Sequence, residues 1–126
     1  MTTRILIADD EPNILISLEY LMKREGYEVH VARDGQEALD AMQRVHPRLV
    51  LLDVMMPRKT GFEVCQAVRA DESLKDTLVL MLTAKGRDTD VARGLGVGAD
   101  AYMTKPFSTQ ELTQKVRELL ATAPRP

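Results

Sequence analysis

Residues 49–53 are Leu-Val-Leu-Leu-Asp, a wholly apolar run that ends at an acid. Such a run is typical of a strand buried on both faces, as the strands of parallel sheets are. Residues 4–8, Arg-Ile-Leu-Ile-Ala, form a second run of this kind, and it also stops at acids, Asp9 and Asp10. The two runs therefore predict buried strands that each lead directly into acidic residues.

Helical patterns alternate with these strands along the chain. After Pro12, which suits a first helical turn, apolar residues recur at helical spacing until Gly26 marks the end. By the same reasoning we predict further strands at 28–32, 78–82 and 100–103, and helices at 35–44, around 62–68, at 88–95 and after the capping-box spacing Ser108 to Glu111. Five strands alternating with five helices predict an α/β fold, a flavodoxin-like doubly wound parallel sheet with strand order 2-1-3-4-5.

The bulk composition excludes several classes of protein. A chain of 126 residues is the size of one domain, which we expect to span residues 1–121, with 122–126 as a tail or the start of a linker. Its formal charge of −2 argues against direct nucleic acid binding by this segment. One cysteine cannot form an internal disulfide, and no run resembles a membrane span or a signal peptide, so we expect a cytoplasmic protein.

The strand ends predict where the chemistry lies, because open α/β sheets bind ligands at the carboxyl ends of their strands. These ends carry Asp9 and Asp10, Asp53, Thr83 and Lys105. With strands one and three as neighbours, the three carboxylates converge. Repulsion within one like-charged pair costs about 4 kcal/mol at ~4 Å and an effective dielectric constant of about 20. A helix dipole returns only roughly 0.3–1 kcal/mol per charge. We therefore expect Lys105 and a divalent cation to offset the repulsion.

Magnesium fits this predicted site better than zinc, since all the candidate ligands are oxygen atoms. A bound Mg²⁺ would neutralise charge on an incoming phosphoryl group and leave a carboxylate free to attack as a nucleophile. Thr83 could then donate a hydrogen bond to one phosphoryl oxygen, and Lys105 could pair with another. The residues alone thus favour aspartyl-phosphate chemistry.

From Ile5 to about Leu120 the chain resembles the receiver domain of two-component response regulators. The features that carry the resemblance are Asp9-Asp10, Asp53, Pro57 with Gly61, Thr83-Ala84 and Lys105-Pro106-Phe107, in that order. The resemblance implies that Asp53 is the phosphoacceptor, that Asp9 and Asp10 hold Mg²⁺, one through water, and that the backbone carbonyl of Met55 is a further metal ligand. It also implies a cis peptide bond between Lys105 and Pro106.

The resemblance further implies the partners and the switch. A sensor histidine kinase or a phosphotransfer protein would supply the phosphoryl group, which the domain itself would help to remove slowly. Thr83 would move toward the phosphoryl group, Tyr102 would turn inward, and the face made by helix 4, strand 5 and helix 5 would then control an unknown output partner. Met55 and Lys85 stand where related proteins modulate dephosphorylation, and neither is an acid or an amide, so we expect a long-lived phosphoryl group.

Several alternatives stay open at this point. Related transcription factors dimerise through the same face with paired charges; here Asp100 and Arg117 are present, whereas Ala101 and Gln110 carry no charge, so a homodimer on phosphorylation is an open option. An aspartyl-phosphate enzyme would usually have a second Asp at the position of Met55. A flavodoxin-like electron carrier would need aromatics to stack its flavin, and the chain has no tryptophan. We expect a switch and not an enzyme, with a phosphorylation-independent docking module as the main alternative.

Overall fold

The computed structural model describes residues 2–84, 92–93 and 96–122. Its strands form one parallel sheet in the order β2-β1-β3-β4-β5, as predicted. The strands are β1 (Arg4–Ala8), β2 (Glu28–Ala32), β3 (Leu49–Asp53), β4 (Leu78–Ala84) and β5 (Ala101–Lys105). The helices are α1 (Pro12–Arg24), α2 (Gly35–Val45), α3 (Gly61–Ala70) and α5 (Thr109–Leu120). The predicted helix over Asp88–Leu95 lies largely outside the described residues.

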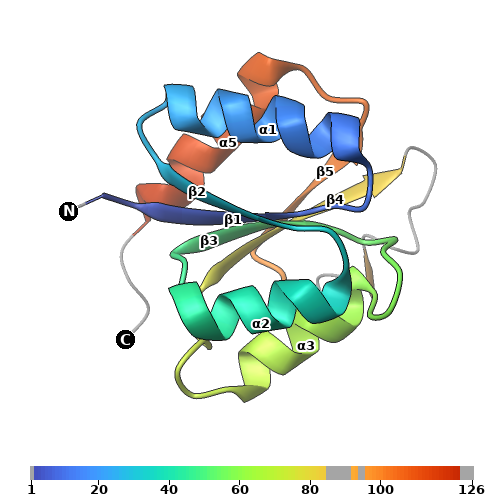
Figure 1. The fold of residues 1–126 in the computed structure, drawn as a ribbon. Coiled ribbons are helices and arrows are strands. Elements are labelled where there is room, and N and C mark those ends of the chain that lie inside the picture. The colour runs from blue at the N-terminus through green and yellow to red at the C-terminus, as the bar shows by residue number, and fades with distance from the viewer. Residues whose placement is uncertain (1, 85–91, 94–95, 123–126) are drawn as a thin grey trace.

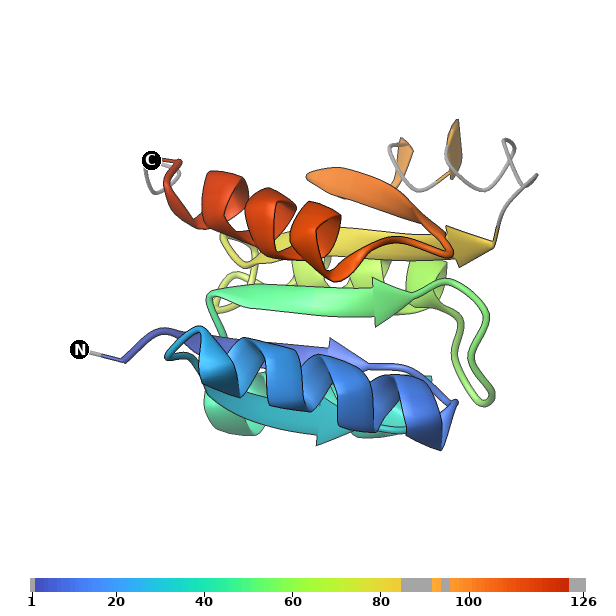
Figure 2. The same cartoon turned by 90° about the horizontal axis from the view of Figure 1, so that it is seen from above.

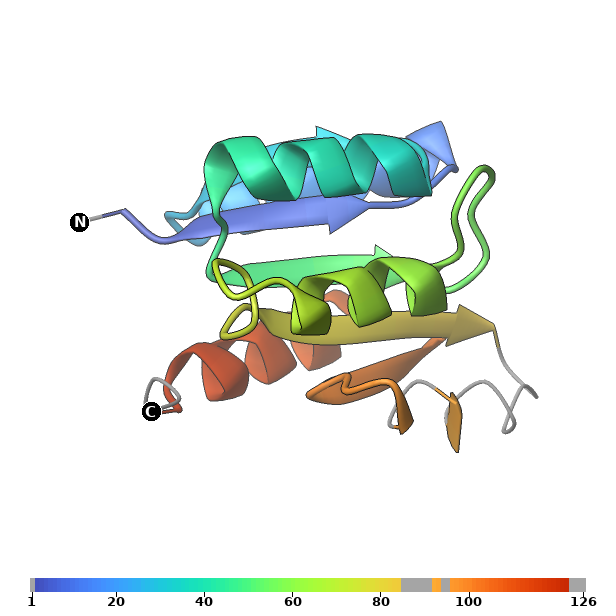
Figure 3. The same ribbon diagram turned by 90° about the horizontal axis from the view of Figure 1, so that it is seen from below.

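Helices cover both faces of the sheet (Figure 1). α1 and α5 lie on one face (Figure 2), and α2 and α3 lie on the other (Figure 3). Because side chains alternate along a strand, Leu49 and Leu51 belong to the apolar cluster under α1 and α5, whereas Val50 and Leu52 belong to the cluster under α2 and α3. Both clusters share β3, in which all 5 residues are buried. Within the described residues, no helix is both long and apolar enough to span a membrane.

The helices α2, α3 and α5 begin at side-chain caps that the sequence supplies, whereas Glu11 at the start of α1 makes no side-chain capping hydrogen bond. Asp34 accepts a hydrogen bond from the Glu37 amide at 2.8 Å at the start of α2. Thr60 begins α3 with a full capping box. Ser108 accepts from the Glu111 amide at 3.0 Å at the start of α5, where the sequence spacing predicts a cap. These caps fix where the chain turns into a helix after β2, β3 and β5.

β4 and β5 extend further than the apolar pattern predicts, to residues 84 and 105 in place of 82 and 103. The ladder pairs Thr83 with Thr104 and Ala84 with Lys105, so these residues continue the sheet. Ladder hydrogen bonds join backbone groups, which every residue carries, and the polarity of a side chain therefore does not mark where a strand stops. The extra residues bring Thr83 and Lys105 to the carboxyl end of the sheet.

Arginines gather at the amino end of the sheet, where the parallel strands begin. Arg4 donates to the carbonyl of Val45 at the end of α2, at 2.9 Å. Arg48, just before β3, donates to the carbonyl of Thr122 just past α5, at 3.1 Å. Each guanidinium therefore joins the beginning of a strand to the end of a helix.

Arg69 of α3 makes the largest set of these contacts. Its guanidinium donates hydrogen bonds to the carbonyl oxygens of Lys75 (3.0 Å), Thr77 (2.6 Å) and Gly98 (2.9 Å) and to the Asp100 carboxylate (2.6 Å). The Asp100 carboxylate also accepts from the Val79 amide at 2.8 Å. Only 17% of the Arg69 side chain and 9% of the Asp100 side chain are exposed. Arg69 thus ties α3 to the starts of β4 and β5.

Candidate functional site

Three carboxylates meet at the carboxyl end of the sheet. Asp9 and Asp10 follow β1, and Asp53 is the last residue of β3. Because β1 and β3 are paired with Ala8 beside Leu52, Asp9 comes to lie next to Asp53. One carboxylate oxygen from each of the three aspartates lies within 4.8 Å of the others. The convergence expected from the strand order is therefore observed.

Lys105 reaches the two buried acids of this cluster. Asp9 is 0% exposed and Asp53 is 7% exposed, whereas Asp10 is open to solvent. The Nζ of Lys105 lies 2.9 Å from Oδ2 of Asp9 and 3.5 Å from Oδ1 of Asp53. Asp9 also accepts a hydrogen bond from the Glu11 amide at 3.0 Å. The ammonium therefore bridges the ends of β1 and β3, with the shorter ion pair to Asp9.

The surroundings of Asp53 disfavour its charged form. Burial and the neighbouring Asp9 carboxylate raise the pKa of Asp53 from 3.8 to about 6, although Lys105 and a hydrogen bond from the Met55 amide act in the opposite direction. Burial also opposes the charge on Lys105, but its contacts with Asp9 and Asp53 outweigh this and raise the pKa of Lys105. At neutral pH the site therefore holds carboxylates that repel one another beside a firmly protonated lysine.

The donor atoms suit a hard divalent cation. The three aspartates offer oxygen ligands, and Lys105 is the cation that contacts them within the described residues. Three carboxylates against one ammonium leave two negative charges, which a divalent ion would balance. Oxygen ligands and excess negative charge are what Mg²⁺ binds in proteins, usually while it keeps several waters. The cluster can therefore hold a metal ion.

Met55 and Thr83, the other predicted site residues near Asp53, occupy different positions. The side chain of Met55 is 54% exposed, while its backbone amide donates to the Asp53 carboxylate. Thr83 is buried and follows Leu82, the residue of β4 that pairs with Asp53. Its hydroxyl donates to its neighbour's carbonyl, that of Ala84, at 3.4 Å. Thr83 thus lies on the strand beside Asp53, one residue nearer the carboxyl end.

Tyr102 and the charged residues of the predicted switch face lie away from the acids. Tyr102 pairs with Met81 in the ladder and is 43% exposed. Asp100 contacts Arg69, as described above. Arg117 donates from Nε (2.9 Å) and from a terminal nitrogen (2.5 Å) to the carboxylate of Glu25 at the end of α1. The two side chains considered for charge pairs across a dimer, Asp100 and Arg117, therefore both form ion pairs within the chain. The Lys105–Pro106 bond is cis, as the resemblance implies.

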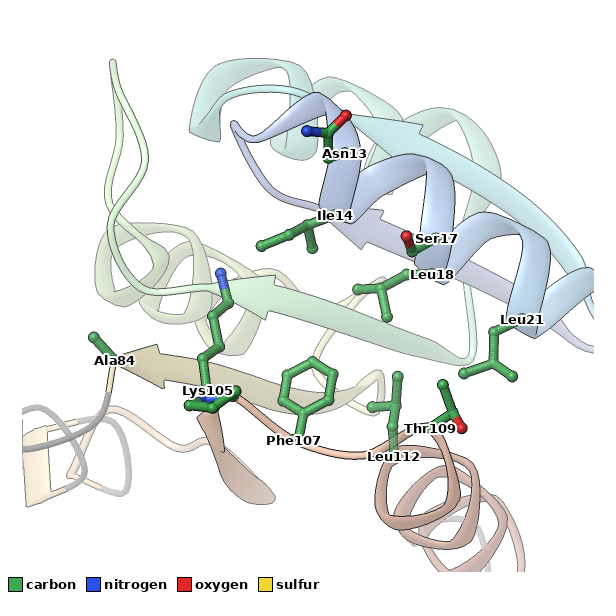
Figure 4. A pocket seen from close by; sticks show the side chains of 11 residues that line it. Asn13, Ile14, Ser17, Leu18, Leu21, Ala84, Lys105, Phe107, Thr109 and Leu112 are labelled. Carbon is green, nitrogen blue, oxygen red and sulfur yellow. The ribbon is translucent and has the colours of Figure 1, made fainter.

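A cavity of about 490 Å³ lies beside the acidic cluster, between α1 and the segment that leads from β5 into α5 (Figure 4). Apolar side chains, among them Leu18, Phe107 and Leu112, form much of its lining. Figure 4 shows the alkyl chain of Lys105 at the rim and its amine pointing away from Phe107. Asn13, Ser17 and Thr109 also line it, but none of the described residues of its lining carries a carboxylate, so the ionic chemistry belongs to the acidic cluster.

The sequence interpretation missed a glycine contact beside the site. The Gly35 amide donates to the carbonyl of Pro57 at 3.2 Å, in the β3–α3 loop, which comprises residues 54–60. A Cβ atom at Gly35 would overlap the backbone of Lys59 in that loop. The pattern treated Gly35 only as the start of a helix. The available signal was the Asp34-Gly35 dipeptide, which marks a tight turn.

Comparison with known proteins gives concordant results. Residues 5–117 match the family model described as the response regulator receiver domain. Over 120 residues the chain is 44% identical to the alkaline phosphatase synthesis transcriptional regulatory protein PhoP of Bacillus subtilis (strain 168). The match covers 95% of this chain and 49% of that protein. The chain therefore spans about half the length of this curated relative.

Solved structures agree in both fold and sequence. The chemotaxis response regulator CheY4 of Vibrio cholerae has a TM-score of 0.89 and 34% identity, and the match covers 94% of this chain and 99% of that one. A CheY-like receiver domain protein from Methanospirillum hungatei JF-1 has a TM-score of 0.89 and 31% identity, with 95% and 94% coverage. Domains of this family act in general as phosphorylation-controlled signalling switches and not as enzymes. This chain belongs to the receiver domain family of two-component response regulators.

Proposed function

We propose that this domain accepts one phosphoryl group on the carboxylate of Asp53, with Mg²⁺ as the cofactor. The observation that carries the proposal is the convergence of the Asp9, Asp10 and Asp53 carboxylates within 4.8 Å, with Lys105 in contact with two of them. The donor is a phosphohistidine of a sensor histidine kinase or of a phosphotransfer protein.

The transfer exchanges one bond for another. A carboxylate oxygen of Asp53 attacks the phosphorus atom, the bond from phosphorus to the donor's imidazole nitrogen breaks, and that nitrogen takes up a proton. Asp9, Asp10, Asp53 and the backbone carbonyl of Met55 would hold Mg²⁺, which when bound offsets charge on the phosphoryl oxygens. Lys105, which already contacts Asp53, is placed to pair with one of those oxygens.

The phosphoryl group then changes the conformation of the domain. It adds about −1.5 to −2 charge and three strong acceptor oxygens, which attract the Lys105 ammonium and the Thr83 hydroxyl. As Thr83 moves, Tyr102 turns inward, and the face of the predicted helix at 88–95, β5 and α5 presents a different surface to the output partner. Phosphorylation in this scheme shifts a population between two arrangements that both exist beforehand.

The domain is proposed to assist its own phosphorylation and slow dephosphorylation, without turning over a small substrate. Met55, two positions after Asp53, has a thioether side chain, which orients an attacking water poorly. Lys85, the second residue that the sequence points to, lies outside the described residues. We therefore propose that the acyl phosphate is long-lived.

The setting of the domain is also proposed. Residues 1–121 form the receiver domain and 122–126 a tail or the start of a linker, in a cytoplasmic protein. The PhoP relative is named a transcriptional regulatory protein, and this chain matches about half of it, so an output domain that binds DNA is one candidate partner. A homodimer on phosphorylation would have to exchange the internal pairs of Asp100 with Arg69 and of Arg117 with Glu25 for pairs between subunits.

The proposal is tested by incubating the chain with MgCl₂ and acetyl phosphate and measuring its intact mass. We expect an adduct of one phosphoryl group that is absent after Asp53→Asn and absent when EDTA removes the metal. Asp40→Asn is the matched control, because Asp40 is exposed on α2 and does not belong to the acidic cluster. This control variant should form the same phosphoryl adduct as the wild-type chain.

The outcomes separate the proposed functions. An adduct that persists in Asp53→Asn would place the phosphoryl group on another residue. No adduct in the wild-type chain, under conditions that label another receiver domain, would contradict the phosphoacceptor proposal. It would favour a docking module that works without phosphorylation.

A further inference from the structure

The β3–α3 loop is held at both ends and in its middle. At its start the Val54 amide donates to the Leu82 carbonyl at 3.1 Å, and at its end the Gly61 amide donates to the Val54 carbonyl at 2.9 Å. In between, the loop lies against the first residue of α2, where the Gly35 amide donates to the Pro57 carbonyl at 3.2 Å. The loop begins directly after Asp53, and it contains Met55.

The contact at Gly35 leaves no room for a side chain. A Cβ atom there would overlap the carbonyl oxygen of Lys59 and would lie 2.5 Å from the Cβ and 2.6 Å from the carbonyl carbon of that residue. These neighbours are backbone and Cβ atoms, which cannot swing away as the end of a long side chain can. The loop and the helix therefore approach each other as closely as two backbones permit.

The helix is the better anchored of the two partners. Asp34 caps its first turn by accepting from the Glu37 amide, and Ala38, Ala41 and Met42 pack it into the core with 0–1% exposure. In the loop, Val54 and Met56 pack into the same core, whereas its outer part, with Pro57 and Arg58, is exposed. A Cβ atom at Gly35 would therefore displace the outer part of the loop around Lys59, and with it the backbone that follows Met55, and leave the helix in place.

We propose that Gly35 is a positioning residue for the metal site. By allowing α2 to touch the loop, it sets the backbone of the segment from Asp53 to Lys59, and with it the Met55 carbonyl. Gly35 itself touches neither metal nor phosphoryl group. This inference rests on the proposed function, since it assigns Gly35 a role in the binding of Mg²⁺ by Asp9, Asp10, Asp53 and Met55.

The test compares Gly35→Ala with Gly96→Ala. A Cβ atom at Gly96 meets nothing within 4 Å, so this variant adds the same methyl group without the contact. Calorimetric titration with MgCl₂ should show binding weakened about tenfold or more in Gly35→Ala, in the range typical when a partner of metal ligands is changed. Gly96→Ala should bind as the wild-type chain does. Urea denaturation without Mg²⁺ checks that each variant is folded.

A measurement on the wild-type chain keeps the inference testable if Gly35→Ala does not fold. Amide NMR during the MgCl₂ titration should show the Gly35 resonance shifting together with those of the loop residues other than Pro57, while that of Gly26, on the other side of the sheet, stays in place. A folded Gly35→Ala with wild-type affinity, or a Gly35 resonance that does not shift, would overturn the positioning role. A wild-type chain that binds no Mg²⁺ would overturn the proposed metal site, and this inference with it.

Discussion

The two ends of the sheet hold their charged side chains in opposite ways. At the amino end, Arg69 is almost buried, yet its guanidinium donates four hydrogen bonds, one of them to the Asp100 carboxylate. At the carboxyl end, Asp9 and Asp53 are at least as deeply buried, but they share one ammonium within the described residues and lie beside a third carboxylate, that of Asp10. One end satisfies its charges and the other leaves negative charge in excess.

The difference separates stability from function. A buried charge stabilises a fold only when partners replace the water that it loses. The amino end meets that condition, and its arginines join strands to helices. The carboxyl end does not, and the raised pKa of Asp53 records the resulting cost. A cation and a phosphoryl group would supply what this end lacks, so neutralising a charge should have opposite effects at the two ends.

The largest effect is expected at the amino end, from Arg69→Met. The variant keeps an apolar chain of similar length but removes the guanidinium, so the Asp100 carboxylate loses its ion pair and three carbonyls lose this donor. Removing one partner of a largely buried ion pair should lower the free energy of unfolding by about 2–4 kcal/mol. Urea denaturation followed by circular dichroism measures the loss.

Arg44→Met is the control for this prediction. Arg44 is exposed near the end of α2, so its replacement should change the free energy of unfolding by less than about 0.5 kcal/mol. If both variants lost the same small amount of stability, the contacts of Arg69 would not hold the amino end together.

The opposite sign is expected at the carboxyl end, from Asp53→Asn. The pKa of Asp53 is 3.8 before burial and about 6 in the fold, so the wild-type chain loses stability as the pH rises through this window. The variant carries no such cost. Without Mg²⁺ it should be more stable than the wild-type chain by about 2 kcal/mol at neutral pH, and the two should converge near about pH 4.

Denaturation of both chains over this pH range, with EDTA present, measures the difference. Asp40→Asn is again the matched control and should show no such trend, since its carboxylate is exposed on α2. A wild-type chain that is the more stable one at neutral pH would mean that Lys105 already compensates Asp53 in full.

A smaller effect is expected from the metal itself. A ligand that binds only the folded chain at ten times its Kd stabilises it by about 1.4 kcal/mol. MgCl₂ should therefore raise the melting temperature of the wild-type chain and should have less effect on Asp53→Asn. Because protons compete for Asp53, the gain should shrink as the pH falls below the folded pKa of about 6. Thermal unfolding with MgCl₂ or EDTA at several pH values tests this, and a gain independent of pH would place the cation elsewhere.

The sequence predicts the carboxyl end far better than the amino end. Apolar runs that stop at Asp9, Asp10 and Asp53 predict the strands and show which acids stand at their ends. Parallel topology then brings these acids together. Lys105 is separated from Asp9 by 96 positions, but it also stands at the end of a strand, so the same rule locates it. The sheet order and the convergence of the acids were predictable for this reason.

The contacts of the amino end follow no such rule. Arg69 lies inside α3, and its partners are mostly backbone carbonyls, which every residue carries, so no residue type marks them. Asp100 was predicted to begin a strand and was considered as a charge for a dimer contact, whereas its carboxylate accepts from Arg69 and from the Val79 amide within the chain. Gly35 was missed for a related reason, since space between two backbones leaves no pattern in side-chain polarity.

The smallest predicted effect tests whether backbone strain also distinguishes the two ends. Arg58 in the β3–α3 loop has φ 72°, and His46 at the end of α2 has φ 50°, so a residue other than glycine adopts left-handed backbone at each end of the sheet. Glycine relieves that strain but gains freedom in the unfolded chain. Arg58→Gly and His46→Gly should therefore each stabilise the fold by only about 0.5–1 kcal/mol, as urea denaturation can measure. Equal gains would leave charge as the difference between the ends, whereas a much larger gain at Arg58 would show that the loop beside Asp53 stores strain as well.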